Sequence, residues 1–166
     1  MPETRAFTVL FVCTGNTCRS PMAEAMLRAR LPAGWRERVQ VFSAGTAAVA
    51  DLPASSNTLE VLERGGVPLE GHRSRQFTRA MAEEADLVLA LTAEHRGEIL
   101  AAAPAAADRT FVLSTYLAGP GGADELVVHD PMGGSLETYE EAYRRIGAHL
   151  DRVLPGILER VGAPRE

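Results

Sequence analysis

Short apolar runs alternate along the chain with longer segments of helical periodicity, and this alternation limits the folds open to it. Four runs have the length and composition of buried strands, at residues 8–12, 39–44, 87–91 and 110–113. Helical patterns lie between them and after the last one, at residues 21–30, 55–64, 78–84, 93–102 and 136–161. Alternating strands and helices predict a three-layer α/β domain with a parallel sheet and helices on both faces.

Proline and glycine residues mark where these elements start, stop and turn. Pro21 stands in the first turn of its helix, and a helix that starts with capping residues at Ser55 stops at Gly65-Gly66. Pro155 lies inside the last helical segment, where we expect a bend or a break. The glycine-rich run at residues 119–123 predicts a surface loop.

The size, charge and cysteine content of the chain narrow its class. At 166 residues it suits one domain, residues 1–166, which can bury a full core without disulfides. Its net charge of −5 disfavours a nucleic acid or an anionic membrane as partner. The chain has two cysteines, no signal-like N-terminus and no apolar run near the ~18 residues of a membrane span, which together favour the reducing cytoplasm.

The segment after the first strand carries the strongest functional signal. Ligands on parallel sheets bind beyond the carboxyl ends of strands, where the strand order reverses, and the first strand ends at Cys13. Glycine and asparagine tolerate positive φ, so the loop can curl and turn its N–H groups inward around an anion. The following helix N-terminus and an arginine fork suit the same anion. We expect a phosphate site made by Thr14, Gly15, Asn16, Thr17, Cys18 and Arg19.

Cys13 stands at the start of this anion site, where it can act as a nucleophile. The amides and the helix end that hold a phosphate also stabilise a thiolate, and a thiolate aimed at a bound phosphorus is an activated nucleophile. The five-residue gap to Arg19 lets both side chains reach one phosphate. A Cys-x5-Arg spacing alone would indicate only a buried strand-end cysteine and a solvated arginine. The flanking strand, turn and helix start make the functional interpretation the stronger one.

The run at residues 9–25, VLFVCTGNTCRSPMAEA, resembles the signature loop of the low-molecular-weight protein tyrosine phosphatase family. Further segments that resemble the family recur in order along nearly the whole chain, at residues 43–46 (SAGT), 71–75 (GHRSR), 85–89 (ADLVL) and 129–131 (HDP). The resemblance implies a four-stranded parallel sheet with flanking helices, of the flavodoxin-like type. It also implies that the substrates are phosphorylated protein side chains.

The resemblance assigns the acid of the reaction to Asp130. A phosphoryl leaving group needs a proton, and Pro131 keeps Asp130 out of helical geometry and stiffens its loop. By the resemblance, Asp130 protonates the leaving atom and then acts as base for the water that hydrolyses a phosphocysteine. An Asp-Pro pair considered alone would indicate a plain turn.

Four residues match the family positions that form a hydrogen-bonded shell beneath the loop, namely Asn16, Ser20, Ser43 and His72. Asn16 can brace a strained loop, and the Ser20 hydroxyl can donate to the Cys13 thiolate. The other histidines, His95, His129 and His149, show no ligand-like grouping, so we expect no metal site and no cofactor. For the oligomeric state we expect a monomer or a weak dimer.

Cys18 shares the loop with Cys13 and is a candidate redox partner. A reactive thiolate is easily oxidised, and a nearby cysteine can trap it as a reversible disulfide, which the resemblance also suggests. The alternative is that Cys18 is a small packing residue. No cysteine follows Cys18, which excludes an arsenate reductase that passes a disulfide along three cysteines.

The loop interior and the pocket rim bear on the substrate. The run at residues 13–20 (CTGNTCRS), with Thr17 before the second cysteine, resembles the bacterial branch that acts on protein phosphoarginine. The tyrosine branch often has an apolar residue such as isoleucine at the position of Thr17. Met132 and two glycines follow Asp130-Pro131, and residues 46–51 lack an aromatic side chain, so a clamp for a phenyl ring is poorly supported. We favour phosphoarginine, and the alternative is phosphotyrosine, with Thr17 a neutral substitution in a tyrosine phosphatase of broad specificity.

Two other classes remain open on the residues alone. A non-catalytic phosphate-binding module could use the same loop, although it would need neither Cys13 nor Asp130. A flavodoxin-like cofactor carrier could share the sheet, although a Cys-Arg pair serves no purpose in binding a flavin. Turnover of p-nitrophenyl phosphate and the colour of the purified protein distinguish these classes from a phosphatase.

Overall fold

The computed structural model describes residues 5–118 and 127–162 of the chain. Its strands are β1 (Phe7–Cys13), β2 (Val39–Gly45), β3 (Leu87–Ala90) and β4 (Thr110–Val112). Its helices are α1 (Arg19–Arg30), α2 (Ser56–Arg64), α3 (Arg79–Glu84), α4 (Ala93–Ala102), the 3-10 helix η1 (Pro104–Arg109) and α5 (Leu136–Val161). The loop expected at residues 119–123 lies outside the described residues.

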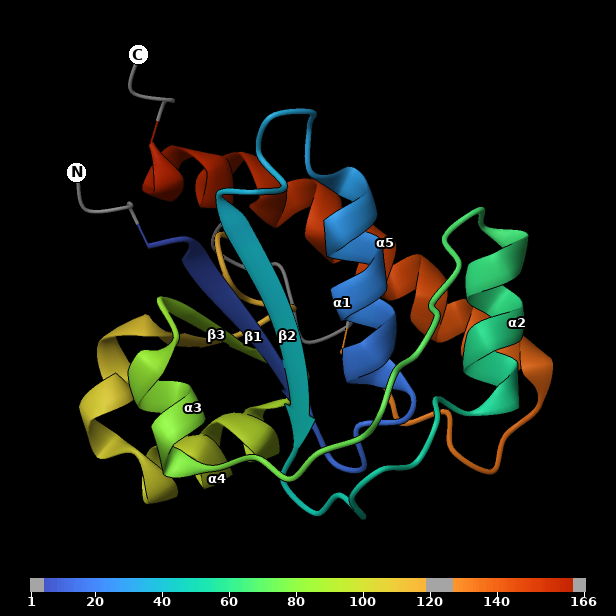
Figure 1. Ribbon diagram of the computed structural model, residues 1–166. Helices are drawn as coiled ribbons and strands as arrows, with labels where there is room; N and C mark the ends of the chain where they lie inside the picture. The colour runs from blue at the N-terminus through green and yellow to red at the C-terminus, as the bar shows by residue number, and fades with distance from the viewer. Residues whose placement is uncertain (1–4, 119–126, 163–166) are drawn as a thin grey trace.

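The four strands form one parallel sheet in the order β2-β1-β3-β4 (Figure 1). β1 lies between β2 and β3, so that Val9 is in register with Val41 on one side and with Leu87 on the other. The chain therefore leaves β1 toward one edge of the sheet and later returns to the other side of β1. This arrangement confirms the expected fold class and puts the reversal of strand order at the carboxyl end of β1.

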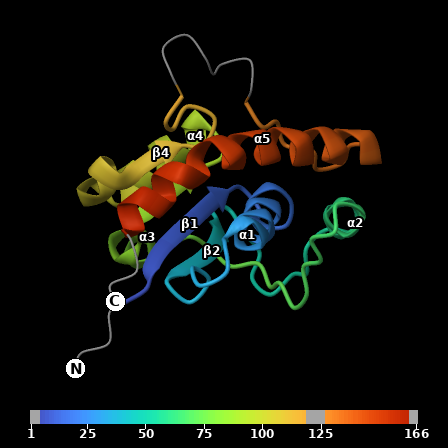
Figure 2. The ribbon, with the colours of Figure 1, turned by 90° about the horizontal axis from the view of Figure 1, so that it is seen from above.

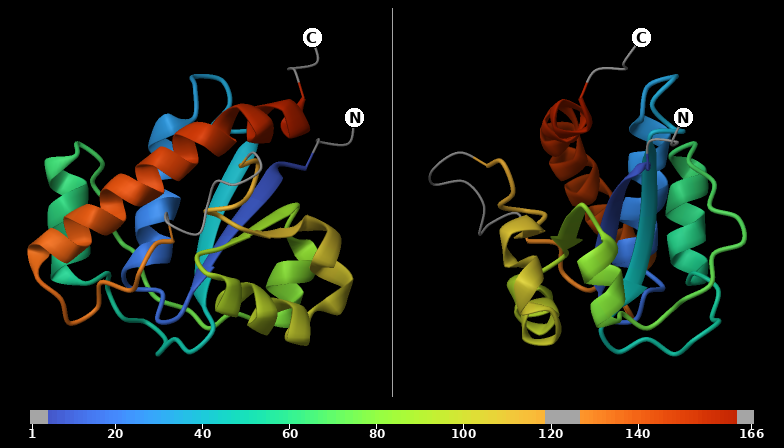
Figure 3. Two further views of the ribbon diagram at one scale, coloured as in Figure 1. Left: turned by 180° about the vertical axis from the view of Figure 1, so that it is seen from behind. Right: turned by 60° about the vertical axis from the view of Figure 1, so that its left-hand side comes forward.

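Helices cover both faces of the sheet, which gives three layers (Figures 1 and 3). α1, α2 and α5 lie on one face, and Figure 2 shows α1 between the sheet and α2. α3 and α4 lie on the opposite face. None of the helices in the two described ranges is long and apolar enough to cross a lipid bilayer.

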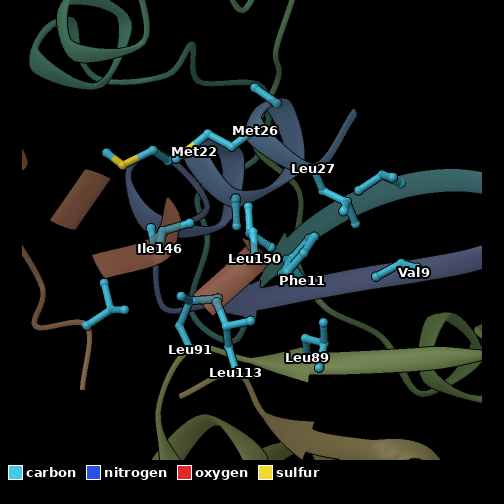
Figure 4. Packing of buried hydrophobic residues seen from close by; sticks show 14 of the residues in the cluster. Val9, Phe11, Met22, Met26, Leu27, Leu89, Leu91, Leu113, Ile146 and Leu150 are labelled. Atoms are coloured by element: carbon cyan, nitrogen blue, oxygen red, sulfur yellow. The ribbon is translucent and has the colours of Figure 1, made fainter. Parts of the chain in front are cut away.

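The alternation of side chains along β1 divides the core in two. Val9, Phe11 and Cys13 point to the face covered by α1 and α5, whereas Leu10 and Val12 pack against the opposite face. Figure 4 shows the larger half of the core, where large side chains from α1 and α5 meet those of the strands. The fully buried members labelled there include Met22, Met26, Ile146 and Leu150. Cys13 thus leaves the strand on the side where α1 begins.

The element boundaries follow the local signals of the sequence closely. The side chains of Ser55, Thr78 and Thr92 cap the starts of α2, α3 and α4 by accepting main-chain N–H groups. α1 begins at Arg19, two residues before the expected start at Pro21. α5 continues through Pro155, and the break considered there does not occur. Packing of the helix on the core outweighs the lost main-chain hydrogen bond.

Candidate active site

The loop between β1 and α1 directs its carbonyl groups away from its own centre. The Cys13 and Thr14 carbonyls accept hydrogen bonds from the N–H groups of Thr46 and Ala47, both at 2.9 Å. The Thr17 carbonyl accepts from the N–H of Ser55 at 3.0 Å and from the Thr58 hydroxyl at 3.2 Å. The loop is therefore held from outside, by the segment after β2 and by the start of α2.

The N–H groups of the same loop face the other way. Within the described part of the chain, the main-chain N–H groups of residues 14–18 donate to no carbonyl and no side chain. Main-chain donors without a protein partner that surround one point form an anion site. The start of α1 adds its positive end, because the first turn of a helix leaves its own N–H groups unpaired.

Asn16 holds this loop in an uncommon conformation. Its φ of 58° lies in the left-handed region, and its side chain is completely buried. The side-chain oxygen accepts from the N–H of Arg75 at 3.0 Å, and that contact decides the orientation of the amide, because a main-chain N–H can only donate. The side-chain nitrogen then donates to the hydroxyls of Ser20 at 2.8 Å and Ser43 at 2.9 Å.

The hydroxyl of Ser20 is in turn available to Cys13. Because its oxygen already accepts a hydrogen from Asn16, its own hydrogen is free to donate. The Cys13 Sγ lies 2.9 Å from Ser20 Oγ, closer than the carbonyl of Ala44 at 3.5 Å. A thiolate can only accept, so this contact stabilises the ionised sulfur. The loop, Ser20 and Cys13 thus form one connected hydrogen-bond network.

His72 supports the loop from outside. Its Nε2 lies 2.7 Å from the carbonyl oxygen of Asn16, and it must donate there because a carbonyl only accepts. The neighbouring Arg75 donates from Nε to the Ser43 carbonyl at 3.0 Å. The segment that contains both residues therefore joins the loop to β2, and the structure brings all four expected shell residues together.

Arg19 and Asp130 both line the cavity and lie close to each other. The Arg19 guanidinium is buried and donates to the Val128 carbonyl at 3.1 Å. One of its nitrogens is 3.7 Å from the Asp130 carboxylate, which is 48% exposed. The other carboxylate oxygen of Asp130 accepts from the N–H of Met132 at 3.1 Å. Arg19 is thus fixed within the site, while Asp130 stays accessible at its edge.

A cavity of about 250 Å³ opens above the loop. The expected nucleophile, the acid and all the expected phosphate-binding residues except Asn16 line it together, namely Cys13, Thr14, Gly15, Thr17, Cys18, Arg19 and Asp130. Its remaining wall is apolar and includes Val49, Leu52 and Met132, which are 67%, 43% and 58% exposed. Two larger hollows, of about 670 and 650 Å³, are lined by no cysteine. The described residues include no cluster of potential metal ligands.

Comparison with known proteins is in agreement with this geometry. The profile of a family described as low molecular weight phosphotyrosine protein phosphatase matches residues 8–163. A low molecular weight protein-tyrosine-phosphatase from Streptomyces coelicolor is 38% identical over 159 residues, which cover 93% of this chain and 96% of that protein. The chain belongs to the low molecular weight phosphotyrosine protein phosphatase family.

Two solved structures of relatives add to this assignment. The YwlE arginine phosphatase from Geobacillus stearothermophilus superposes with a TM-score of 0.83 at 35% identity, over 96% of this chain and 99% of that one. A YwlE mutant with a phosphorylated active-site serine has a TM-score of 0.79 at 36% identity, with coverages of 93% and 99%. A phosphorylated residue at the active site of a relative agrees with a covalent phosphoenzyme, and this phosphatase is of the cysteine-dependent class.

Cys18 is the last residue of the loop of the phosphatase before α1, and it is buried. Its Sγ is 3.4 Å from the Ser55 hydroxyl and 3.6 Å from the hydroxyl of Tyr139, and both cysteines are free. Burial raises the pKa of Tyr139, as does its hydrogen bond to Cys18. Tyr139 is therefore a packing residue of the core, whose hydroxyl helps to hold the loop.

His95 is a site residue that the sequence reasoning missed. It lies in the first turn of α4, and its Nε2 is 2.8 Å from the hydroxyl oxygen of Thr14. Burial lowers its pKa to about 4, with a further decrease from the charge of Arg19 and opposing contributions from Glu98 and Asp130. The sequence contained one signal for this role of His95. The residue lies three positions after Thr92, just beyond the carboxyl end of β3, and β3 lies beside β1.

Gly45 allows the end of β2 to approach the loop. A Cβ atom at this position would lie 2.4 Å from the Thr14 carbonyl oxygen and 2.9 Å from the Asn16 nitrogen. Both atoms belong to the main chain of the loop, which is fixed by other contacts and cannot move aside freely. A glycine is therefore required here for steric reasons.

We expect Gly45→Ala to lower kcat/KM for p-nitrophenyl phosphate about 10²-fold, because the added methyl group displaces the loop that positions the phosphate. Gly97→Ala is the matched control, since a Cβ at Gly97 in α4 meets nothing within 4 Å. The control should keep its activity and gain about 0.5–1 kcal/mol of stability. Equal activities of the two variants would contradict the steric role of Gly45.

The buried His95 predicts a stability change with pH. Its pKa is about 4 in the folded protein against an ordinary value of 6.5, so the unfolded chain binds the proton more tightly. The free energy of unfolding should therefore fall as the pH falls from about 6.5 toward about 4. Urea denaturation at about pH 7 and about pH 5 should show a smaller decrease for His95→Gln than for the wild type. An identical decrease would show that His95 does not contribute.

Proposed function

We propose that this phosphatase hydrolyses phosphorylated protein side chains, with Cys13 as nucleophile, Arg19 as phosphate ligand and Asp130 as general acid. The observation that carries the proposal is the sulfur of Cys13 beside a ring of inward N–H groups, with the Ser20 hydroxyl at 2.9 Å. This arrangement can both stabilise a thiolate nucleophile and bind its target. A passive phosphate-binding module needs neither the sulfur nor the carboxyl group.

In the first step the Cys13 thiolate attacks phosphorus. An S–P bond forms as the bond from phosphorus to the leaving oxygen or nitrogen breaks, and the electron pair stays on the leaving atom. Asp130 donates its proton to that atom, because it stands at the accessible edge of the cavity. The inward N–H groups and Arg19 stabilise the charge on the three remaining phosphoryl oxygens.

In the second step water attacks the phosphocysteine. Asp130, now ionised, accepts a proton from that water as an O–P bond forms and the S–P bond breaks. The electron pair returns to Cys13 as a thiolate, which Ser20 stabilises as a leaving group. Inorganic phosphate then leaves the cavity, and the enzyme is restored to its starting state.

For the substrate we favour phosphoarginine. Thr17 lines the cavity and is buried, with its hydroxyl oxygen 3.8 Å from Cys18 Sγ. A hydroxyl there can bond to a polar guanidinium, whereas isoleucine cannot. The exposed rim residues Val49, Leu52 and Met132 are aliphatic, which suits a flexible methylene chain as well as it suits a ring.

Phosphotyrosine is the second candidate substrate. The Streptomyces relative is named as a tyrosine phosphatase, and the YwlE structures are of arginine phosphatases, at similar identities to this chain. An apolar rim can also contact a phenyl ring, with the Met132 thioether against its edge. A direct comparison of the two substrates is therefore required.

The proposed chemistry favours a reducing compartment, since it needs Cys13 as a free thiol, and we place the enzyme in the cytoplasm. Both cysteines are free in the structure. The catalytic groups all come from one chain, so a monomer is sufficient for activity, and a weak dimer is compatible with it.

Cys13→Ser should abolish turnover of p-nitrophenyl phosphate, because a serine hydroxyl is a far weaker nucleophile than a thiolate. Asp130→Asn should lower kcat about 10²–10⁴-fold on a phosphorylated peptide, since the leaving atom loses its proton donor. Asp108→Asn is the control, because its side chain is 83% exposed and belongs to η1. Steady-state kinetics of these variants test the roles of Cys13 and Asp130. Full activity of Cys13→Ser would overturn the proposal.

Thr17→Ile tests the substrate preference. We expect the ratio of kcat/KM for phosphoarginine to that for phosphotyrosine peptides to fall about tenfold or more, because a polar group of the pocket is replaced by an apolar one. Thr58→Ser is the control, since its hydroxyl supports the Thr17 carbonyl from outside the cavity. An unchanged ratio in Thr17→Ile would show that Thr17 does not set specificity.

Mild peroxide tests Cys18 as a redox partner. We propose that oxidised Cys13 is trapped by Cys18 as a disulfide, which requires Cys18 to leave its contacts with Ser55 and Tyr139. Mass spectrometry should detect a Cys13–Cys18 bond, and a dithiol should restore activity. In Cys18→Ser, oxidation should be irreversible. Progressive sulfinic acid at Cys13 in the wild type, without a disulfide, would refute this role.

A further inference from the structure

The contact between His95 and Thr14 has no part in the mechanism described above. The imidazole of His95 is 4% exposed, and both of its nitrogens have hydroxyl partners. Nε2 lies 2.8 Å from Thr14 Oγ1, and Nδ1 lies 3.0 Å from Thr92 Oγ1. The ring therefore connects the residue that follows the nucleophile to the N-cap of α4.

The number of available hydrogens indicates the direction of the hydrogen bonds from Thr92 through His95 to Thr14. Thr92 Oγ1 accepts the main-chain N–H of His95 at 3.2 Å, and its own hydrogen is then left for Nδ1. A neutral ring that accepts at Nδ1 carries its hydrogen on Nε2, which donates to Thr14. The opposite tautomer leaves the hydroxyl hydrogen of the half-buried Thr92 to solvent alone, with no acceptor among residues 5–118 and 127–162.

The surroundings of the ring keep it neutral. Burial disfavours the imidazolium, and so does the positive charge of Arg19. Glu98 and Asp130 act in the opposite direction, but they do not outweigh these two effects, and the pKa of His95 stays near 4. At neutral pH the ring therefore carries one hydrogen, and Nδ1 remains an acceptor.

We propose that His95 is a positioning residue that orients the Thr14 hydroxyl as a hydrogen-bond donor into the phosphate cavity. Thr14 lines that cavity, and a hydroxyl that already accepts from Nε2 has its own hydrogen left to give. An ionised phosphoryl oxygen can only accept, so the fixed donor adds to the N–H groups and Arg19. The inference rests on the phosphate chemistry proposed for this site.

Inorganic phosphate, used as a competitive inhibitor of p-nitrophenyl phosphate hydrolysis, tests the proposal. Thr14→Val and His95→Leu should each raise the inhibition constant of phosphate about tenfold, the effect of losing a hydrogen bond to a charged group. The double variant should be no worse than either single one, because both remove the same donor. Thr115→Val, an exposed residue outside the cavity, should keep the wild-type constant.

A substitution that keeps the donor separates positioning from packing. The side-chain amide of His95→Gln can place an N–H near the position of Nε2, so this variant should recover most of the phosphate affinity that His95→Leu loses. Thermal stability, measured alongside, would change in both variants if His95 mattered for packing alone. Additive losses in the double variant, or an unchanged constant in Thr14→Val, would overturn the inference.

The tautomer itself can be observed in the wild-type enzyme. Nitrogen-15 NMR of the imidazole at about neutral pH should show hydrogen on Nε2 of His95 and none on Nδ1. Hydrogen on Nδ1 would reverse the direction of the hydrogen bonds through His95. This result would contradict the proposal even if the variants fail to fold. If the wild type shows no turnover at all, the proposed function fails instead, and the NMR result still reports on the His95 contact.

Discussion

The buried side-chain amide of Asn16 joins three regions of the chain, namely the loop with the start of α1, β2 and the segment at Arg75. It accepts from the main chain at Arg75, donates to Ser20 of α1 and to Ser43 of β2, and belongs to the loop after β1. Its three contacts use both donors and one acceptor, so its orientation is determined and the loop cannot relax without breaking hydrogen bonds. Asparagine tolerates the left-handed backbone found at Asn16, and this network holds it in place.

The chemistry of the site follows from that constraint. A loop with its carbonyl groups held outward must present its N–H groups inward, and the Ser20 hydrogen is directed at Cys13 because Asn16 occupies the Ser20 oxygen. Arg19, which starts α1, completes the ring from the side. In the proposed mechanism the same N–H groups stabilise a thiolate before a substrate arrives and the phosphoryl oxygens afterwards. Nucleophile activation and phosphate binding are thus two results of one backbone conformation.

The elements of the fold could be predicted from the sequence because each has local signals. Strand runs, threonine and serine caps and the Gly65-Gly66 stop are all short-range features, and the helices and strands form where these features place them. The loop after β1 was recognisable for the same reason, since its cysteine, glycine, asparagine and arginine lie within a few residues. Of the bend or break expected at Pro155, the break does not occur, because tertiary packing carries α5 past a residue that disfavours helix.

The parts that were missed depend on strand order, which a single sequence does not reveal. His95 meets Thr14 only because β3 lies beside β1, and Gly45 approaches the loop only because β2 lies on the other side. The exposed aliphatic rim was expected in part, at residues 46–51 and at Met132, whereas Leu52 was not. The contacts of His95 and Gly45 join residues far apart in sequence, so the spacing of these residues does not predict which partners they meet.

Trapping of the phosphoenzyme tests most directly whether the Asn16 network makes Cys13 a nucleophile. Rapid acid quench and mass spectrometry should find a phosphoryl group on Cys13 of the wild type within one turnover. In Asn16→Ala, which leaves Ser20 and Ser43 without their donor, the same adduct should form about 10²-fold more slowly. A phosphoryl group on any other residue, or an unchanged rate in Asn16→Ala, would contradict the account.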